Sequence, residues 1–262
     1  MGISSLHSWN LKIKTAMNLE IDMKDLGICA SIFDALLSNI INNAYPDNIL
    51  PGENDLCSIL NVSRTTIRAV LEKLQAKGVI TKLPKKKTEI NPIRNWNWLD
   101  HEILNALYDH LDHKELLSHV FYLRFTFEPR ACALSALNST IEDLNKMATA
   151  FAKMQQGLMQ GDRALFKQGD IELHSSLFIS SHNPFFASLS ELIINTSVIS
   201  IENTIESSQE DMQTALALHG KLIDAIRIKD PLEAQKIMNK LLQDSIAQIF
   251  TNNIPEYIAI FK

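Results

Sequence analysis

The sequence predicts a mainly α-helical protein of two domains: a small N-terminal unit of three helices and a β-hairpin, and a C-terminal all-helical bundle of six to seven helices. Three observations support this expectation. Apolar residues recur at helical spacing through most of the chain, β-prone runs occur only at 79–83 and 88–90, and 262 residues are comfortable for two domains. We expect four consecutive segments: an N-terminal extension over 1–24, the first domain over 25–91, a linker over 92–98 and the helical domain over 99–255.

The N-terminal domain is organised around the segment 61–78, which predicts a turn followed by an amphipathic helix. Its apolar positions recur at i, i+3, i+4 and i+7 and are Ile67, Val70, Leu71 and Leu74. Ser63 can cap the start of this helix, and Gly78 supplies the left-handed residue that ends it. The polar residues that leave the stripe crowd the N-terminal end, where a DNA recognition helix carries its contacts; they are Arg64, Thr65 and Arg68. Taken alone, the segment also fits a surface helix with two arginines.

The neighbouring segments favour DNA binding. Helices are predicted upstream over 25–44 and 53–60, and a three-residue turn separates the second of them from the central helix. Downstream, two short β-prone runs flank a basic tip with Lys85, Lys86 and Lys87, which predicts the wing of a winged helix-turn-helix. Lysines at such a tip can reach the DNA backbone or the minor groove. An isolated lysine triplet is usually a solvated loop, but this one follows a candidate recognition helix.

Charge is distributed unevenly along the chain. The window 53–90 holds eight basic and four acidic residues, a net charge of +4, whereas the rest holds 17 basic and 26 acidic residues, a net charge of −9. The whole chain has a net charge of −5. A basic module joined to an acidic body is expected when one domain meets phosphates and the other does not. The composition, 46% apolar and 21% charged, supports folded cores. Three cysteines without paired spacing, and the lack of a membrane-spanning run or signal-peptide core, predict a cytoplasmic protein without membrane association.

From Leu99 onward the apolar pattern is helical. We expect breaks at the stretch Gly157–Gly161, at Asn183-Pro184, at Ser207-Ser208 and at Asp230-Pro231, partly because the residue before proline avoids the α region. Helices are therefore predicted near 98–109, 112–137, 140–158, 161–181, 184–206, 208–229 and 231–252.

Two segments of the helical domain hold a candidate metal site. Asp170 and His174 lie four residues apart in GDIELHSSLF, which places a carboxylate and an imidazole one turn apart on one helix face. His219 lies on a later helix beside apolar residues, so its ring is also expected to point inward. An aspartate and two histidines converging in a bundle suit a divalent transition metal such as Zn, Ni or Mn. Each histidine could instead be a satisfied core or boundary residue, the role we assign to His101, His110, His113, His119 and His182.

Arg124 lies in the strongly apolar helical segment FYLRFTFEPRACALSAL, where a cation needs a partner. Glu128, one turn on, could be that partner. Alternatively, Arg124 lines a pocket and holds an anionic ligand, since a guanidinium matches a carboxylate in bidentate fashion. The sequence holds no phosphate-cradling glycine loop, nucleophile elbow or HExxH motif, so we expect no enzyme activity.

The segment from Pro46 to Ile90, with LPGENDL, VSRTTIR and the lysine-tipped wing, resembles the DNA-binding domain of GntR-family bacterial transcription regulators. The helical domain is similar to the FCD effector domain of the FadR-type branch of that family. Its matching pieces are LRFTFEPRACALSAL, DIELHSSLFISSHNP and LHGKLIDAIRIKDPLEA. The linker NWNWLD before such a body is most similar to the sugar-acid regulators of the family, those of galactonate, hexonate and hexuronate operons. The resemblance spans residues 26–250.

This resemblance implies a ligand-responsive regulator, a repressor rather than an activator. A homodimer would place two recognition helices in successive major grooves of a palindromic operator. Arg64 and Arg68 would contact the operator, with Thr65 and Thr66 beside them. The usual glycines of the wing fall at Lys85 and Lys87, so side chains would contact DNA where the family uses backbone.

The resemblance also implies that Asp170, His174 and His219 hold a divalent metal, with an anionic effector such as a sugar acid against the metal and Arg124. The family pattern has a third histidine at the position of Leu241, so this chain would offer three ligands and water or an effector oxygen would complete the shell. Three alternatives stay open: a metal-free regulator of the same family that binds an acyl thioester, a metal-dependent hydrolase fused to a DNA-binding domain, and an architectural DNA binder.

Overall fold

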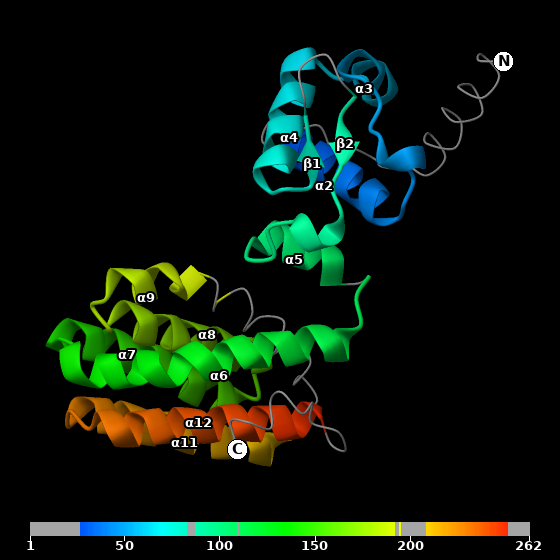
Figure 1. Ribbon diagram of the computed structural model, residues 1–262. Helices are drawn as coiled ribbons and strands as arrows, with labels where there is room; N and C mark the ends of the chain where they lie inside the picture. The colour runs from blue at the N-terminus through cyan, green and yellow to red at the C-terminus, as the bar shows by residue number, and fades with distance from the viewer. Residues whose placement is uncertain (1–26, 83–86, 109, 192–193, 195–207, 251–262) are drawn as a thin grey trace. The chain divides into compact units, whose positions relative to one another are not determined.

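The computed structural model describes residues 27–82, 87–108, 110–191, 194 and 208–250 (Figure 1). The chain divides into two compact units, Met1–His110 and Leu111–Lys262. Among the described residues, none of the helices is both long enough and apolar enough to cross a membrane.

The N-terminal unit is a winged helix-turn-helix, as the sequence predicts. Its described part includes the helices α2 (Gly27–Ile41), α3 (Glu53–Leu60) and α4 (Arg64–Ala76). The wing consists of β1 (Ile80–Thr81) and β2 (Glu89–Ile90), which pair antiparallel with Ile80 opposite Ile90. Ile49, just after the short 3-10 helix η1 (Pro46–Asn48), bridges to Glu89 on the far side of β2. A hydrophobic core of leucine, isoleucine and phenylalanine side chains joins α2, α3 and α4.

Both ends of α4 follow the sequence prediction. The Ser63 hydroxyl accepts a hydrogen bond from the Thr66 amide at 3.2 Å, which satisfies one of the free amides of the first turn. Gly78 directly follows the C-cap residue Lys77 and has φ +74°, a conformation that glycine adopts without steric cost. A Cβ at this position would lie 2.7 Å from the carbonyl oxygen of Asn95, so the glycine also lets the linker approach α4.

The linker packs on the N-terminal unit, and so does the helix that follows it. Trp96 follows the 3-10 helix η2 (Ile93–Asn95) and is buried. Its indole nitrogen donates a hydrogen bond to the carbonyl of Asn91 at 2.9 Å. The next helix, α5 (His101–Tyr108), was expected to open the helical domain but belongs to the N-terminal unit instead. The reason is electrostatic as well as apolar, since the carboxylates at the start of α5 pair with lysines of α4. These pairs are Asp100 with Lys77, Glu102 with Lys77 at 2.9 Å, and Glu102 with Lys73 at 2.5 Å.

The second unit is an all-helical bundle in its described part. Its helices are α6 (His113–Asn138), α7 (Ile141–Gln160), α8 (Arg163–Ile179), α9 (Pro184–Ser188), α11 (Gln209–Arg227) and α12 (Pro231–Ile249). Helix α6 packs against α8, α11 and α12, and α7 packs along α8 (Figure 1). The predicted helix over 184–206 starts correctly at Pro184, but most of its remainder lies outside the described residues.

Two glycines bring α7 and α8 close together. A Cβ at Gly157 would lie 2.5 Å from the Phe166 amide nitrogen, and one at Gly169 would lie 2.6 Å from the Ala150 carbonyl oxygen. Gly157 was expected to lie in a break, but it sits within α7, which continues to Gln160. The two backbones therefore pack almost in contact, which fixes the position of α8 next to Gly169.

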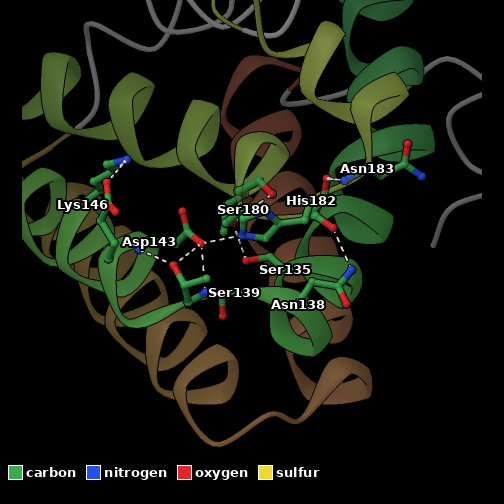
Figure 2. A network of polar contacts seen from close by, with 12 residues as sticks. Ser135, Asn138, Ser139, Asp143, Lys146, Ser180, His182 and Asn183 are labelled. Carbon is green, nitrogen blue, oxygen red and sulfur yellow. Dashed lines mark hydrogen bonds and ion pairs between the residues drawn. The ribbon is translucent and has the colours of Figure 1, made fainter.

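A network of polar contacts joins three interhelical turns of this unit (Figure 2). The Asn138 amide donates to the Ser181 carbonyl at 2.7 Å, and the His182 ring lies 2.8 Å from the Asp143 carboxylate. The Lys229 ammonium donates to the Ser139 carbonyl at 2.7 Å. His182, assigned from sequence to a satisfied or exposed role, thus helps to hold the end of α8 against the start of α7.

Candidate metal centre, effector cavity and DNA-binding surface

Asp170 and His174 of α8 and His219 of α11 converge inside the helical bundle, as the sequence predicts. The His219 Nε2 lies 3.0 Å from Asp170 Oδ1, and the His174 Nε2 lies 3.7 Å from the same oxygen. The two Nε2 atoms are 3.3 Å apart. Both histidines are buried, whereas the Asp170 side chain keeps 14% of its surface exposed. Within the described residues, these three side chains form the group whose donor atoms could share a metal ion.

The hydrogen bonds on the far side of each ring define the tautomers. His219 Nδ1 lies 2.8 Å from the Ala215 carbonyl oxygen, and His174 Nδ1 lies 2.7 Å from a Glu128 carboxylate oxygen. Because both oxygens can only accept, both Nδ1 atoms donate, and in neutral rings each Nε2 presents its lone pair. Two lone pairs and a carboxylate oxygen then face one another, an arrangement that requires a cation or a proton between them. The donor set therefore fits a divalent metal.

Within the cluster, the acidic and the basic side chains each favour the charged form of the other. Burial disfavours the charged form of His174, but the carboxylates of Glu128 and Asp170 outweigh it and raise the pKa of this histidine. Burial likewise opposes ionisation of Asp170, yet the charge of His174 and the contact with the His219 ring hold the pKa of Asp170 well below its usual range. The carboxylates of the cluster therefore favour a positive charge at the position that a metal ion would occupy.

Glu128 connects the cluster of Asp170, His174 and His219 to Arg124. The Arg124 Nε donates to Glu128 Oε1 at 2.6 Å, and both side chains are buried. Burial would raise the pKa of Glu128, but Arg124 and His174 lower it to about 2, so the carboxylate is charged. The sequence indicated Glu128 as a partner of Arg124 but not as the residue that orients His174. The sequence feature that could have indicated this second role is the position of Glu128 in an apolar helix, where a buried carboxylate needs more than one partner.

A cavity of about 400 Å³ opens beside the cluster, and Asp170, His174 and His219 form part of its wall. Arg124 lines it as well and also pairs with Glu128, and its role in holding an anionic ligand stays a prediction. Leu241, the position where the resemblance places a further histidine, also lines the cavity with an apolar side chain. Two basic residues on the wall, Arg163 and Lys167, were missed from sequence because they lie outside the apolar and histidine patterns.

The predicted DNA-contacting residues lie on or next to α4 and the wing. Arg64, Thr65 and Arg68 are exposed on the first two turns of α4. Thr66 is half-buried, and its hydroxyl lies 2.8 Å from that of Ser63, so it takes part in the helix cap. Lys87 is exposed, whereas Lys85 and Lys86 lie outside the described residues. Their role in DNA binding stays a prediction.

The presence of these two units in one chain defines a class of protein. Residues 29–90 match the model of the gntR family of bacterial regulatory proteins, and residues 119–244 match the FCD domain. The chain belongs to the GntR family and is a DNA-binding transcription regulator with an FCD effector domain. The prediction of this family from the residues is confirmed.

The chain is also similar to individual transcription regulators and to solved structures. The chain is 32% identical over 214 residues to the uncharacterized HTH-type transcriptional regulator YieP of Escherichia coli strain K12, covering 80% of this chain and 90% of YieP. It is 28% identical over 211 residues to the galactonate operon transcriptional repressor of the same strain, covering 80% and 91%. The solved structure of Lar, which controls the expression of the Listeria monocytogenes agr system, covers 88% of this chain with a TM-score of 0.54 and 15% identity, a likeness of fold alone.

Proposed function

We propose that this regulator is a repressor whose operator affinity is controlled by a small carboxylate, a sugar acid, bound beside a divalent metal in the cavity of the FCD domain. The observation that carries the proposal is the pair of Nε2 atoms, 3.3 Å apart, that face Asp170 at the cavity wall. One carboxylate oxygen and two imidazole nitrogens suit Zn, Ni or Mn. When bound, the metal would act as a Lewis acid that attracts an anionic oxygen from the cavity.

The residues of the cavity support an anionic effector. Arg124 lines the cavity together with two further cations, Arg163 and Lys167, and a guanidinium favours carboxylate oxygens. A volume of about 400 Å³ lies within the range of small-molecule sites. With Leu241 on the wall, the three protein ligands leave coordination positions for water or for an effector oxygen. The 28% identical relative that represses a galactonate operon supports the sugar-acid class.

Regulation would follow from differential binding. A homodimer would place two α4 helices in successive major grooves of a palindromic operator, with Arg64, Thr65 and Arg68 at the DNA. An effector that binds the DNA-incompetent arrangement more tightly shifts the population away from the operator-bound state. A preference of about 100-fold corresponds to about 2.7 kcal/mol of coupling, which is ordinary for allosteric proteins.

The experiment measures metal content and effector binding separately. Purified wild type and the variants His174→Ala and His219→Ala are analysed for Zn, Ni and Mn, with His182→Ala as a control because this histidine bonds Asp143 rather than the cluster. We expect metal in the wild type and the control and loss of metal in the two cluster variants. Equal metal content in all four proteins would exclude the site.

A thermal-shift screen then tests the effector. Galactonate, gluconate and glucuronate are compared with and without the metal found, and at least one should raise the melting temperature only when the metal is present. Stabilisation by an acyl thioester in metal-free protein would instead favour the alternative regulator. No shift with any carboxylate would favour an architectural DNA binder.

A further inference from the structure

One carboxylate of the N-terminal unit bonds two cations that come from different elements of the DNA-facing surface. Glu53 is the first residue of α3, and its Oε2 accepts a hydrogen bond from the Arg68 Nε of α4 at 3.0 Å. Its other oxygen, Oε1, accepts from the Lys82 ammonium, directly after β1 at the base of the wing. Glu53 therefore connects the recognition helix to the wing through their basic side chains.

We infer that Glu53 is a positioning residue for DNA recognition, which holds Arg68 and Lys82 in place before DNA arrives and raises discrimination between operator and other sequences. This inference rests on the proposed role of α4 and the wing in DNA binding. The contact is separate from the metal cluster and the cavity of the FCD domain, which lie in the other unit.

The chemistry of Arg68 explains how Glu53 can favour specific contacts. Glu53 engages the Nε–H, whereas bidentate recognition of a guanine edge uses the terminal nitrogens of the guanidinium. A side chain that is already restrained loses less conformational entropy when it meets the correct base, and it cannot rotate freely towards a phosphate. The Arg68 side chain stays 60% exposed, so the carboxylate restrains it without burying it.

The negative charge of Glu53 acts against nonspecific binding. Hydrogen bonds from Lys82 and Arg68 lower the pKa of Glu53, so the carboxylate is fully charged at neutral pH. It offsets the two cations that would otherwise pair with phosphates on DNA of any sequence. Discrimination improves when the binding of competing sequences is weakened as well as when correct contacts are strengthened.

A purely structural role would not require this geometry. Ion pairs between exposed side chains contribute little to folding stability, and Arg68 and Lys82 both remain accessible. The contacts join residues 15 and 29 positions apart in sequence, from three elements that meet at the predicted DNA surface. The arrangement therefore sets the directions of side chains more than it stabilises the fold.

The test compares affinities of the full-length protein for two duplexes. The operator duplex is the sequence recovered by in vitro selection with the wild type, and the second duplex has the same composition in scrambled order. Fluorescence anisotropy gives both dissociation constants over a salt series for Glu53→Gln. The matched control is Asp55→Asn, which removes the same charge from the same first turn of α3, at an exposed residue that pairs with neither Arg68 nor Lys82.

We expect Glu53→Gln to bind the scrambled duplex about 3- to 10-fold more tightly, with a steeper salt dependence. The ratio of its affinity for the operator to its affinity for the scrambled duplex should fall about 10-fold. Asp55→Asn should leave this ratio within about twofold of the wild type. In an Arg68→Ala background, Glu53→Gln should have a smaller effect on the ratio, because one of its two partners is missing. Thermal unfolding of each variant verifies that the fold is intact.

An unchanged ratio for Glu53→Gln, or an equal fall for Asp55→Asn, would overturn the role of Glu53. The failure of the proposed function gives a different result. If the wild type selects no sequence, or if Arg64→Ala binds the selected duplex as tightly as the wild type does, the assignment of α4 as the recognition helix is wrong. A selected operator that depends on Arg64 but not on Glu53 would reject only the inference about Glu53.

Discussion

Replacement of Glu128 by glutamine tests the contact that joins the candidate metal site to the buried Arg124. The wild-type carboxylate lies 2.7 Å from His174 Nδ1 and accepts from Arg124 Nε at 2.6 Å, with no exposed surface of its own. An amide has the same shape but no charge, and one of its two polar atoms donates instead of accepting. At least one of the two partners therefore loses its acceptor.

Two magnitudes follow from this geometry. Removal of one member of a buried ion pair, here the carboxylate that pairs with Arg124, costs about 3–5 kcal/mol of folding free energy. The loss of the group that orients a metal-ligating histidine typically lowers metal affinity about 10- to 100-fold. Both effects are expected because Glu128 acts on Arg124 and His174 at once.

The assay separates the two effects. Chemical denaturation with a chelator present gives the folding free energy without metal, and calorimetric titration of the metal-free protein gives the dissociation constant for Zn or Mn. Glu172→Gln is the control, because Glu172 lies on α8 with His174 but is half-exposed and pairs with Lys153 of α7, so its loss should cost at most about 1 kcal/mol. If Glu128→Gln retained both the wild-type midpoint and the wild-type metal affinity, the assigned role of Glu128 would be refuted.

Three further outcomes are expected. Arg64→Ala should lose about 1–3 kcal/mol of specific operator binding in a gel-shift titration, and unchanged affinity would show that α4 does not read DNA. Leu241→His should place a further nitrogen at the cavity wall and raise Zn affinity about 10-fold or more in a chelator competition, whereas equal affinity would place position 241 beyond reach of the cluster. Burial opposes ionisation of Asp143, but hydrogen bonds from Thr140 and His182 outweigh it and lower its pKa. The stability from this lowered pKa is present above the unfolded value of about 4 and is lost as pH falls through the folded value. Between about pH 5 and pH 3, the unfolding free energy measured by urea denaturation should therefore fall less for Asp143→Asn than for the wild type. Parallel pH profiles of the two proteins would contradict this reasoning.

The sequence by itself determined the features that depend on neighbours within a turn or two. Ser63 and Gly78 mark the ends of α4 because capping and left-handed conformations are properties of single residues in a local context. Asp170 and His174 share a face because they are four residues apart on a helix, and the apolar pattern around His219 was enough to turn it inward. The order of the helices and the hairpin followed from the same local periodicity.

Only the tertiary structure decided which distant charges pair. Glu128 orients His174 from a position 46 residues away, and Lys77 holds Asp100 from 23 residues away. The second of these pairs assigns α5 to the N-terminal unit, although its apolar pattern does not distinguish the two units. Helical periodicity defines the face on which a charge lies, whereas its partner depends on how the helices pack, and that information is absent from local spacing.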